Sequence, residues 1–417
     1  MTENKLGSRT LYPVISKRRK GILNNLILAI NPGSSSVKFG LYNIEDGIDS
    51  AVCRGVIEGF GSNSSFTIKT NCRSDVELAM SIDKFQKKVA SAVDAYKLIV
   101  EWLSCNLMLQ KIGLVCYRVV HGGNYFSAPV EINSTVLKKL TSLIPLAPLH
   151  QPIELEAVNL FMRHLSGSRH VACFDTAFHR TMPKVAQSFA LPERMRELGI
   201  KPYGFHGLSY QFIVGKVAEV NKGSIPRRLV IAHLGSGASM CALLSGESIS
   251  TSMSFSPLDG LPMATRCGEL DASAVLYMIE ELELSTSEVS DILNKQSGLL
   301  GLSGISGDVR VLMNSDSEKA RLALDYYIHQ ICRELGAMIA TLKGLDALIF
   351  TGGVGSNNNL IRERICKQFE WQGVSLDPEA NQQNENIISH ESSRITVYAL
   401  NTDEELMMAQ LVSRNMK

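Results

Sequence analysis

Two stretches of the chain share one pattern, in which an apolar run, a glycine–serine turn and a strand-like run follow one another. In the first, residues 28–42, Pro32 and Gly33 end the apolar run, and apolar residues alternate with others after the turn. This pattern predicts a strand, a tight turn and a second strand. The second copy covers residues 229–244, with Gly235 in the place of Gly33. The repeat predicts two related halves, each with one such hairpin.

The turn of each hairpin gathers backbone N–H groups and hydroxyls at one point, which makes it a candidate cradle for phosphate. The first turn contains three consecutive serines, residues 34–36. One such stretch could equally be an ordinary serine-rich hairpin, but a second copy favours a site that grips a nucleotide from both sides. No G-x-x-x-x-G-K-[ST] motif occurs, so the predicted site differs from a Walker A loop.

Helical and strand-like patterns alternate along the rest of the chain. Apolar residues at spacings of three and four predict helices over 81–103 and 317–343. Apolar runs predict strands over 112–120, 171–174 and 346–351, and the last of these leads into a glycine loop and another helix. Helix, strand, glycine turn and helix in this order predict an α/β core. Two segments rich in glycine, serine or proline, 251–269 and 298–310, are predicted as long functional loops.

Several polar residues stand where a ligand site is expected. Arg118 lies inside an apolar strand, where a cation needs an anionic partner, either an internal carboxylate or a ligand. Asp175 follows a short strand, His150 lies in a loop between prolines, and His206 lies between glycines. A lone histidine is more often structural than catalytic. Several histidines on such loops favour a site instead.

Composition narrows the range of functions. A length of 417 residues predicts two domains, and a net charge of +1 gives no overall basic excess for nucleic acid or membranes. Nine cysteines without a C-x-x-C pair indicate reduced thiols and a cytoplasmic location. The first 25 residues imitate a signal peptide, but Asn24 and Asn25 interrupt the apolar run, so we expect an N-terminal extension rather than export. No apolar run is long enough to predict a membrane span.

Nine motifs in a fixed order give the chain a specific resemblance. They are N-x-GSSS-x-K-F, R-V-V-H-G-G, L-A-P-L-H-x-P, F-D-T-A-F-H-x-T-M-P, Y-G-F-H-G-x-S, T-R-C-G-E, S-G-I-S-x-D-x-R, F-T-G-G-V-G and T-D-E-E-L. With them the chain resembles the acetate kinases, which belong to the superfamily of actin, sugar kinases and chaperone ATPases. The resemblance runs from about residue 27 to 411.

The resemblance implies an α/β fold of two duplicated actin-like (ribonuclease H-like) domains with a nucleotide cleft between them. The N-terminal domain would cover 26–175 with 406–417, and the C-terminal domain 176–405, after an extension of residues 1–25. The implied activity is the reversible transfer of the γ-phosphoryl group of ATP to acetate, giving acetyl phosphate and ADP. The reaction would use Mg²⁺, or Mn²⁺ in its place, and the family suggests a homodimer.

The resemblance also implies roles for individual residues. Arg118 and Arg266 would flank the carboxylate and the phosphoryl group, His206 would bind the equatorial phosphoryl oxygens, and Asp175 would orient this cluster, with His150 as a further active-site histidine. The remaining implied groups are the magnesium ligands Asn31 and Glu404, the acyl pocket of Val120, Leu149, Phe205 and Pro257, and the nucleotide-binding residues Ser34, Ser36, Lys38, His233, Gly235, Ser236, Gly237, Asp308, Val309, Arg310, Gly353, Val354 and Asn357.

Two alternative functions stay open at this stage. A propionate kinase would differ mainly in the size of the acyl pocket, and a valine at position 120 favours acetate. A chaperone-like or filament-forming ATPase could use the same fold, but a water acceptor would need no carboxylate clamp. The chain departs from the family pattern at Tyr117, Tyr210, Ser236 and Ser356, and the last two bear on the choice of nucleotide.

Overall fold

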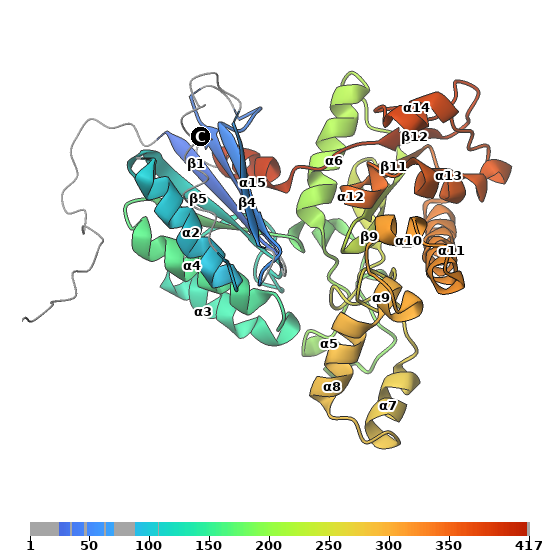
Figure 1. The fold of residues 1–417 in the computed structure, drawn as a ribbon, viewed down its shortest axis with the longest axis horizontal. Coiled ribbons are helices and arrows are strands. Elements are labelled where there is room, and N and C mark those ends of the chain that lie inside the picture. The colour runs from blue at the N-terminus through green and yellow to red at the C-terminus, as the bar shows by residue number, and fades with distance from the viewer. Residues whose placement is uncertain are drawn as a thin grey trace, which may run out of the picture.

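The chain folds into two lobes, each built around a mixed β-sheet with helices on both faces (Figure 1). The computed structural model describes residues 25–33, 36–45, 48–61, 64–70, 88–106 and 108–414. Helices α6 (Gly207–Val220) and α15 (Glu404–Arg414) lie between the two sheets. Of the predicted N-terminal extension, all but Asn25 lies outside the described residues.

The sheet of the first lobe has seven strands in the order β4-β3-β2-β1-β5-β7-β6. Its central strand β1 pairs antiparallel with β2 and parallel with β5, which in turn pairs parallel with β7. The strands are β1 (Leu26–Pro32), β2 (Ser36–Asn43), β3 (Cys53–Glu58), β4 (Ser65–Thr70), β5 (Ile112–Val119), β6 (Val130–Glu131) and β7 (Arg169–Phe174).

The sheet of the second lobe has five strands in the order β10-β9-β8-β11-β12. They are β8 (Arg228–Leu234), β9 (Ala238–Leu244), β10 (Glu247–Thr251), β11 (Ala347–Thr351) and β12 (Thr396–Ala399). In both sheets an antiparallel group of three strands continues into two parallel strands, β3-β2-β1-β5-β7 in one and β10-β9-β8-β11-β12 in the other. The predicted duplication is therefore confirmed. The exact domain boundaries stay a prediction.

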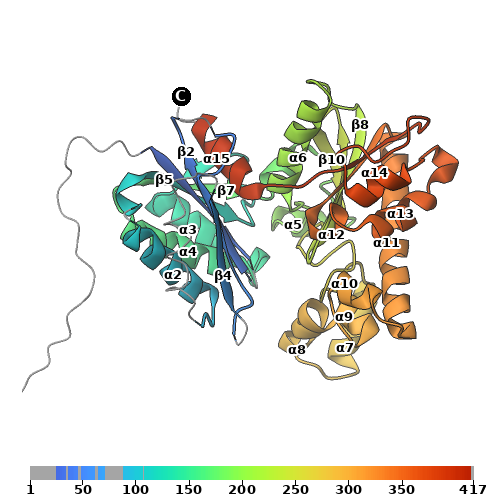
Figure 2. The same cartoon turned by 45° about the horizontal axis from the view of Figure 1, so that its top comes forward.

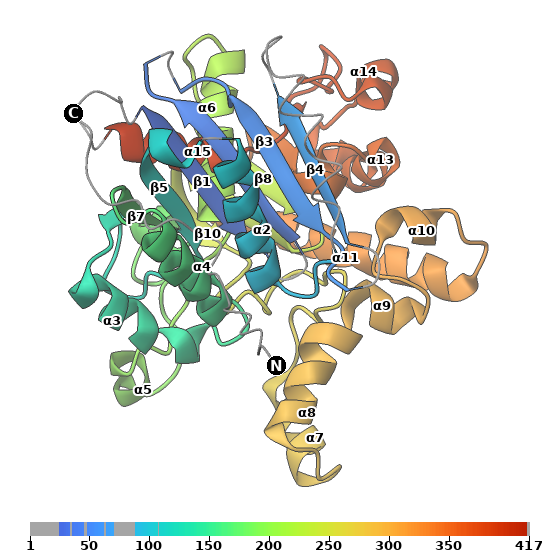
Figure 3. The ribbon, with the colours of Figure 1, turned by 60° about the vertical axis from the view of Figure 1, so that its left-hand side comes forward.

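Helices cover the first sheet on both faces. The helices α2 (Ala92–Cys105), α3 (Ser134–Ser142) and α4 (Gln151–His164) lie on the outer side (Figure 3). There Trp102 packs against Phe39 and Phe66 at the centre of a large apolar cluster. On the inner side, Met407 and Met408 of α15 pack with Ala29 and other residues of the sheet. The last helix of the chain thus completes the core of the first lobe.

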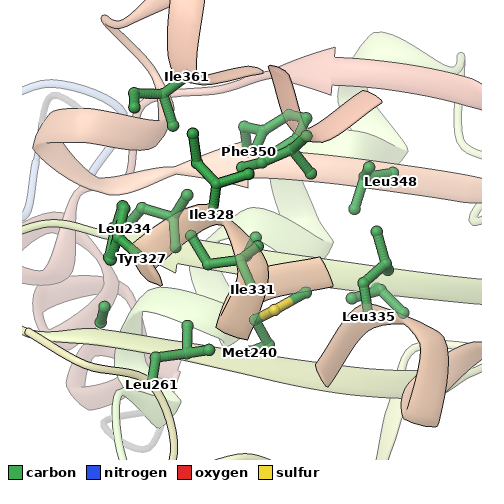
Figure 4. Close-up of a cluster of buried hydrophobic side chains, with 14 of the residues drawn as sticks. Leu234, Met240, Leu261, Tyr327, Ile328, Ile331, Leu335, Leu348, Phe350 and Ile361 are labelled. Atoms are coloured by element: carbon green, nitrogen blue, oxygen red, sulfur yellow. The ribbon is translucent and has the colours of Figure 1, made fainter. Parts of the chain in front are cut away.

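The long helix α11 (Glu318–Leu342) covers one face of the second sheet. Its Tyr327, Ile331 and Leu335 share one buried cluster with Leu348 and Phe350 of β11 (Figure 4). The alternate residues of the same strand, Ala347 and Ile349, share a cluster with α6 on the opposite face. Because successive strand side chains point to opposite faces, an unbroken apolar run such as β11 indicates burial on both sides.

The remaining helices of the second lobe are short. Helices α7 and α8 project from the body of this lobe (Figure 2). The short helices are α5 (Glu193–Glu197), α7 (Ala272–Glu280), α8 (Thr286–Asp291), α9 (Gly298–Ser303), α10 (Val309–Met313), α12 (Gly352–Gly355), α13 (Asn359–Lys367) and α14 (Pro378–Gln383).

Two sequence-based predictions of local structure are wrong in part. The helix predicted over 81–103 begins only at Ala92, where Ser91 caps it by accepting a hydrogen bond from the Asp94 N–H. Just before this helix, the carbonyl of Val89 accepts a hydrogen bond from the N–H of Gly61, which follows β3. The segment at Val89 is therefore bonded to the loop after β3 and does not extend the helix. Residues 81–87 lie outside the described part.

The segment 298–310, predicted as a loop, contains α9 and the start of α10. Its glycines lie in or between short helical turns, and Gly304 ends α9 in the left-handed conformation that glycine adopts readily. By contrast, the helix predicted over 317–343 is confirmed as α11, and Ser317 is its N-cap residue. Within the described residues no helix is long and apolar enough to span a membrane. Eight of the nine cysteines lie in these residues, and all eight are free thiols.

The core around α11 generates a stability prediction. Replacing the fully buried Leu335 by alanine should lower the free energy of unfolding by about 2–5 kcal/mol, because it removes apolar contacts and leaves a cavity. The matched variant Leu322→Ala lies on the same helix but its side chain is exposed, so its effect should stay within about 0.5 kcal/mol. Denaturant unfolding of both variants measures the difference. Equal effects would contradict this account of the core.

Candidate active site

A polar cavity of about 360 Å³ opens between the two lobes and collects most of the predicted site residues. Its walls come from the strand ends of both sheets, which is where open α/β sheets bind their ligands. The residues that line it are Asn31, Gly33, Ser36, Lys38, Arg118, Val120, His150, Asp175, Phe205, His206, His233, Gly235, Ser236, Gly237, Pro257, Arg266, Gly352, Gly353, Thr402, Glu404 and Glu405.

The two glycine–serine hairpins meet at this cavity, as the repeat predicted. In the first turn, Gly33 N–H donates a hydrogen bond of 2.7 Å to the carbonyl of Ser36. In the second turn, Gly235 N–H donates one of 3.0 Å to the carbonyl of Gly237. Both turns are therefore tight and present their polar groups to the cavity. The predicted residue Ser34 lies outside the described residues.

Arg118 answers the question that the sequence left open. Its side chain makes a two-pronged contact with Asp175, with Nη2 to Oδ2 at 2.6 Å and Nε to the same oxygen at 3.0 Å, and Nη1 donates to the Pro32 carbonyl. Burial, the largest single effect, lowers the pKa of Arg118, but the charges of Asp175 and Glu404 and the hydrogen bonds to Asp175 together outweigh it and raise that pKa. The side chain still keeps 14% of its surface exposed, toward the cavity that it lines. Arg118 has an internal partner and also faces the ligand space.

Arg266 is a second cation in the same cavity, and among the described residues it has no carboxylate partner. Its Nη1 donates to the Pro257 carbonyl at 2.9 Å and lies 3.4 Å from the Met263 sulfur. Burial, and then the charge of Arg118, lower the pKa of Arg266. A partly buried cation that meets only neutral acceptors is costly, so this position attracts an anion.

The loop that carries Arg266 is held by the segment that follows it in sequence. Leu299 N–H donates to the Met263 carbonyl at 2.9 Å, and Met263 N–H donates to the Arg266 carbonyl at 3.1 Å. Gly298 has a φ of +62°, and a Cβ there would lie 2.1 Å from the Met263 carbonyl oxygen. The start of α9 therefore packs directly on the Arg266 loop, which only glycine permits at this point.

His206 is held in a strained backbone position at the start of α6. Its φ is +57°, which is uncommon for a residue with a side chain. Next to it, Gly207 N–H donates to the Asp175 carbonyl, and a Cβ on Gly207 would lie only 2.0 Å from that oxygen. Close packing at Gly207 thus ties His206 to the residue that binds Arg118.

A small hydrogen-bond network fixes the His206 ring. Its Nδ1 lies 2.8 Å from the Ser239 hydroxyl, which also bonds the Tyr210 hydroxyl, and the ring stacks on His233 at 4.3 Å between centroids. Burial, followed by the nearby His233 and arginine charges, lowers the pKa of His206 well below its usual value, so the ring is neutral at pH 7. A Cβ on Gly237 would lie 3.3 Å from His206 Nε2, so the glycine leaves that nitrogen open to the cavity.

At the end of the cavity nearest α15, oxygen-bearing side chains gather. Asn31 Nδ2 donates to Glu404 Oε2 at 2.8 Å and to Glu405 Oε1 at 2.6 Å. Mg²⁺ is usually held by one or two carboxylates together with water and substrate phosphates. The two carboxylates and the amide present here fit that requirement.

A second cavity of about 520 Å³ adjoins the first and contains the predicted adenosine residues. It shares Gly235, Ser236 and Gly353 with the main cavity. The predicted residues Asp308, Val309, Arg310, Val354 and Asn357 line the rest of it, together with Gly307, Ala264 and Asn358. Asp308 caps α10, and its carboxylate pairs with Arg310 at 2.6 Å.

Three of the four predicted acyl-pocket residues, Val120, Phe205 and Pro257, line the main cavity. The fourth, Leu149, does not. It is 39% exposed and lines a neighbouring cavity of about 250 Å³, which shares Pro257, Arg266 and His150 with the main one.

Sequence reasoning missed several polar residues of the site. Glu405 belongs to the T-D-E-E-L motif beside the predicted Glu404 and was therefore within reach. Ser239 pairs with His233 across the second hairpin, so counting the register back from the turn would have placed its side chain near the cavity. Glu154, which accepts a hydrogen bond from Val120 N–H, carries no local signal because an acidic residue in the first turn of a helix is ordinary.

Comparisons with known proteins agree with this geometry. The model of the acetokinase family matches residues 26–410. The acetate kinase of Rhodopseudomonas palustris (strain TIE-1) is 42% identical over 94% of this chain and 98% of its own length, and that of Rickettsia prowazekii is 39% identical over 94% and 100%.

Solved structures of the same kind superpose on most of the chain. A propionate kinase from Francisella tularensis has a TM-score of 0.83 and 34% identity, over 93% of this chain and 98% of its own. The acetate kinase of Porphyromonas gingivalis has a TM-score of 0.80 and 33% identity, over 94% and 100%. The predicted α/β fold of two actin-like halves is confirmed, and the chain belongs to the acetokinase family.

Proposed function

We propose that the chain is an acetate kinase, which transfers the γ-phosphoryl group of ATP reversibly to acetate and so forms acetyl phosphate and ADP. The observation that carries the proposal is the pair Arg118 and Arg266, two partly buried cations that face one cavity, of which only the first has a carboxylate partner within the described residues. Such a site suits two anions that must approach each other. The relatives named acetate kinase, at about 40% identity over most of the chain, support acetate as the substrate.

In this proposal Arg118 and Arg266 neutralise the substrate carboxylate and the transferring phosphoryl group. Phosphoryl transfer needs positioning and charge stabilisation more than covalent chemistry. Guanidinium groups suit the task because their planar forks bind carboxylate and phosphate in fixed geometry. The acetate carboxylate is already ionised at neutral pH, so the site needs no general base. Asp175 holds Arg118 in position, and His150 completes the wall beside both arginines.

His206 is the proposed donor to the equatorial phosphoryl oxygens. Because its pKa is lowered, the ring donates a hydrogen bond from Nε2 as a neutral group, and the contact of Nδ1 with Ser239 keeps the ring in place. The serine hydroxyls and backbone N–H groups of the two hairpins, with Lys38 and His233, would bind the phosphate chain, and the second cavity would bind the adenosine part.

Asn31 and Glu404 would hold Mg²⁺, with Glu405 beside them. When bound, the ion would offset the negative charge that develops on the phosphate oxygens during transfer. The residues of this chain contribute the carboxylates that would attract the ion. The Asn31 amide holds these two carboxylates near each other because it donates a hydrogen bond to each.

Propionate kinase activity is the second candidate, because a solved propionate kinase is as similar to this chain as the solved acetate kinases are. The wall formed by Val120, Phe205 and Pro257 would decide between the two acids. One methylene changes binding by only about 1–3 kcal/mol, so we expect a preference for acetate rather than strict selection.

Formation of acyl hydroxamate from ATP, Mg²⁺ and hydroxylamine tests the proposal with acetate, propionate and butyrate in parallel. Arg118→Ala and Arg266→Ala should each lower kcat for acetate by about 100-fold or more, because each removes a charge that stabilises the transition state. The lysine variants should recover little, since lysine lacks the planar fork. Arg163→Ala, an exposed arginine on α4, serves as the control and should keep full activity.

No acyl phosphate from any acid would overturn the kinase proposal. Near-normal kcat in one alanine variant at saturating substrate would remove that arginine from the mechanism. A higher kcat/KM for propionate than for acetate in the wild-type protein would make propionate kinase the function.

We also propose that two copies of the chain associate through helix α7. None of its residues is buried, although its sequence is largely apolar. Leu270, Leu276, Tyr277 and Leu282 are 43%, 54%, 58% and 54% exposed, and the helix projects from the second lobe (Figure 2). Clustered apolar groups of this kind mark an interaction surface, and the homodimer implied by the family resemblance identifies the occupant.

Sedimentation velocity tests this assembly at micromolar concentration. The wild-type chain should sediment as a dimer, and Leu276→Asp with Tyr277→Asp should convert it to a monomer, because two charges would be buried at the contact. The control Leu322→Asp changes an equally exposed leucine on α11 and should leave the dimer intact. A wild-type monomer, or a variant that remains a dimer, would contradict the proposed interface.

A further inference from the structure

The carboxyl group of Glu154 lies behind the acyl pocket and supports its wall. Glu154 is on the first turns of α4, only 2% exposed, and its Oε2 accepts a hydrogen bond of 2.8 Å from the N–H of Val120. Val120 lines the main cavity and follows Arg118 by two residues. One carboxyl oxygen of Glu154 therefore fixes the backbone that carries both the pocket wall and the first arginine.

The other carboxyl oxygen, Oε1, is buried and has no hydrogen-bond partner among the described residues. The same is true of Oε1 of Gln151, one turn earlier on the same helix. Residues three apart lie on one face of a helix, so these two oxygens belong to neighbouring side chains. The amide of Gln151 cannot simply be reversed, because its Nε2 donates to the carbonyls of His121 and Leu140. Two neighbouring oxygens that both lack a donor are explained if one of them carries a proton. A protonated Glu154 would have such a proton to donate.

The charges around Glu154 favour the same state. Arg118 on β5 attracts a negative charge on Glu154, but Asp175 after β7 already pairs with that arginine and repels a second carboxylate. Another polar group near it is Tyr96 on α2, whose hydroxyl donates to the carbonyl of Ile153. This hydroxyl does not compensate a charge on Glu154. Burial, opposed mainly by Arg118, raises the pKa of Glu154 to about 8.

We propose that Glu154 is a positioning residue that works as a neutral carboxylic acid, anchoring Val120 and adding no further negative charge beside Arg118. The proposal rests on the proposed function, because the anion that benefits is the substrate carboxylate. When Glu154 loses its proton, its negative charge offsets part of the positive charge of Arg118 that attracts acetate. Acetate binding then weakens, while the positions of the reacting groups stay the same.

The kinetic test compares the wild-type protein with Glu154→Gln between pH 6.5 and 9.5. Glutamine keeps the acceptor for Val120 N–H and offers its NH₂ group to Gln151, but it cannot ionise. In the wild-type protein KM for acetate should be level up to about pH 8 and then rise by about tenfold per pH unit, with little change in kcat, because only the protonated fraction binds well. In Glu154→Gln the KM should stay level throughout.

Two further variants separate this role from a structural one. Glu156→Gln, an exposed glutamate on the same helix, should keep the wild-type pH profile. Glu154→Ala should raise KM at every pH, because the Val120 backbone loses its anchor. A rise in KM above pH 8 that persists in Glu154→Gln, or its absence from the wild-type protein, would overturn the proposal.

An infrared measurement keeps this test independent of turnover. At pH 7 the wild-type protein should show the C=O stretch of a protonated carboxyl group that is missing from the spectrum of Glu154→Gln. This result is expected even if the chain forms no acyl phosphate, so the two proposals can fail separately. Identical spectra of the two proteins in this region would show that Glu154 is ionised and would refute its role as a neutral acid.

Discussion

The structure depends on a partly buried positive charge that the protein does not fully neutralise. Arg118 and Arg266 face one cavity between the lobes, and Asp175 is the only carboxylate that the described residues place in contact with either of them. Burying a cation without its counter-ion is unfavourable, and the fold tolerates this only because both guanidinium groups bind backbone carbonyls or a carboxylate. The unmet charge is the feature that makes the cleft a site for anions.

Both lobes contribute to holding these cations. Strands β5 and β7 pair in parallel with Arg118 opposite Cys173, which brings Asp175, just past the end of β7, within reach of the guanidinium. The carbonyl of Asp175 then binds Gly207 at the start of α6, and so fixes His206. From the other lobe, Ala264 N–H donates to the carbonyl of Ser236, which joins the Arg266 loop to the second hairpin. The duplicated hairpins therefore carry the nucleotide site and also position the arginines.

The sequence was most informative where local patterns decide the structure. The two hairpins, the helix α11 and the duplicated sheets followed from apolar periodicity and a repeated turn. The start of α2 was not predictable in this way, because Val89 is buried by packing against the loop at Gly61 and imitates a helix position. Leu149 was assigned to the acyl pocket by resemblance, but it points into a side cavity, since only the fold decides which of two adjacent walls a loop residue covers. The place of Glu154 in the site depends on a contact between a helix and the end of a strand. A contact between such distant segments leaves no pattern in the local sequence.

The central claim is that Arg266, partly buried and without a carboxylate partner among the described residues, is kept for an anionic ligand. The melting temperature of Arg266→Met tests it most directly. Without ligand, the variant should melt at the wild-type temperature or above it, because an uncompensated buried charge is removed. With acetyl phosphate at about 100 times its Kd, the wild-type protein should gain about 2.7 kcal/mol of stability, and the variant should gain little. A variant that melts far below the wild type without ligand, yet is stabilised equally by acetyl phosphate, would contradict the account and make Arg266 a structural residue.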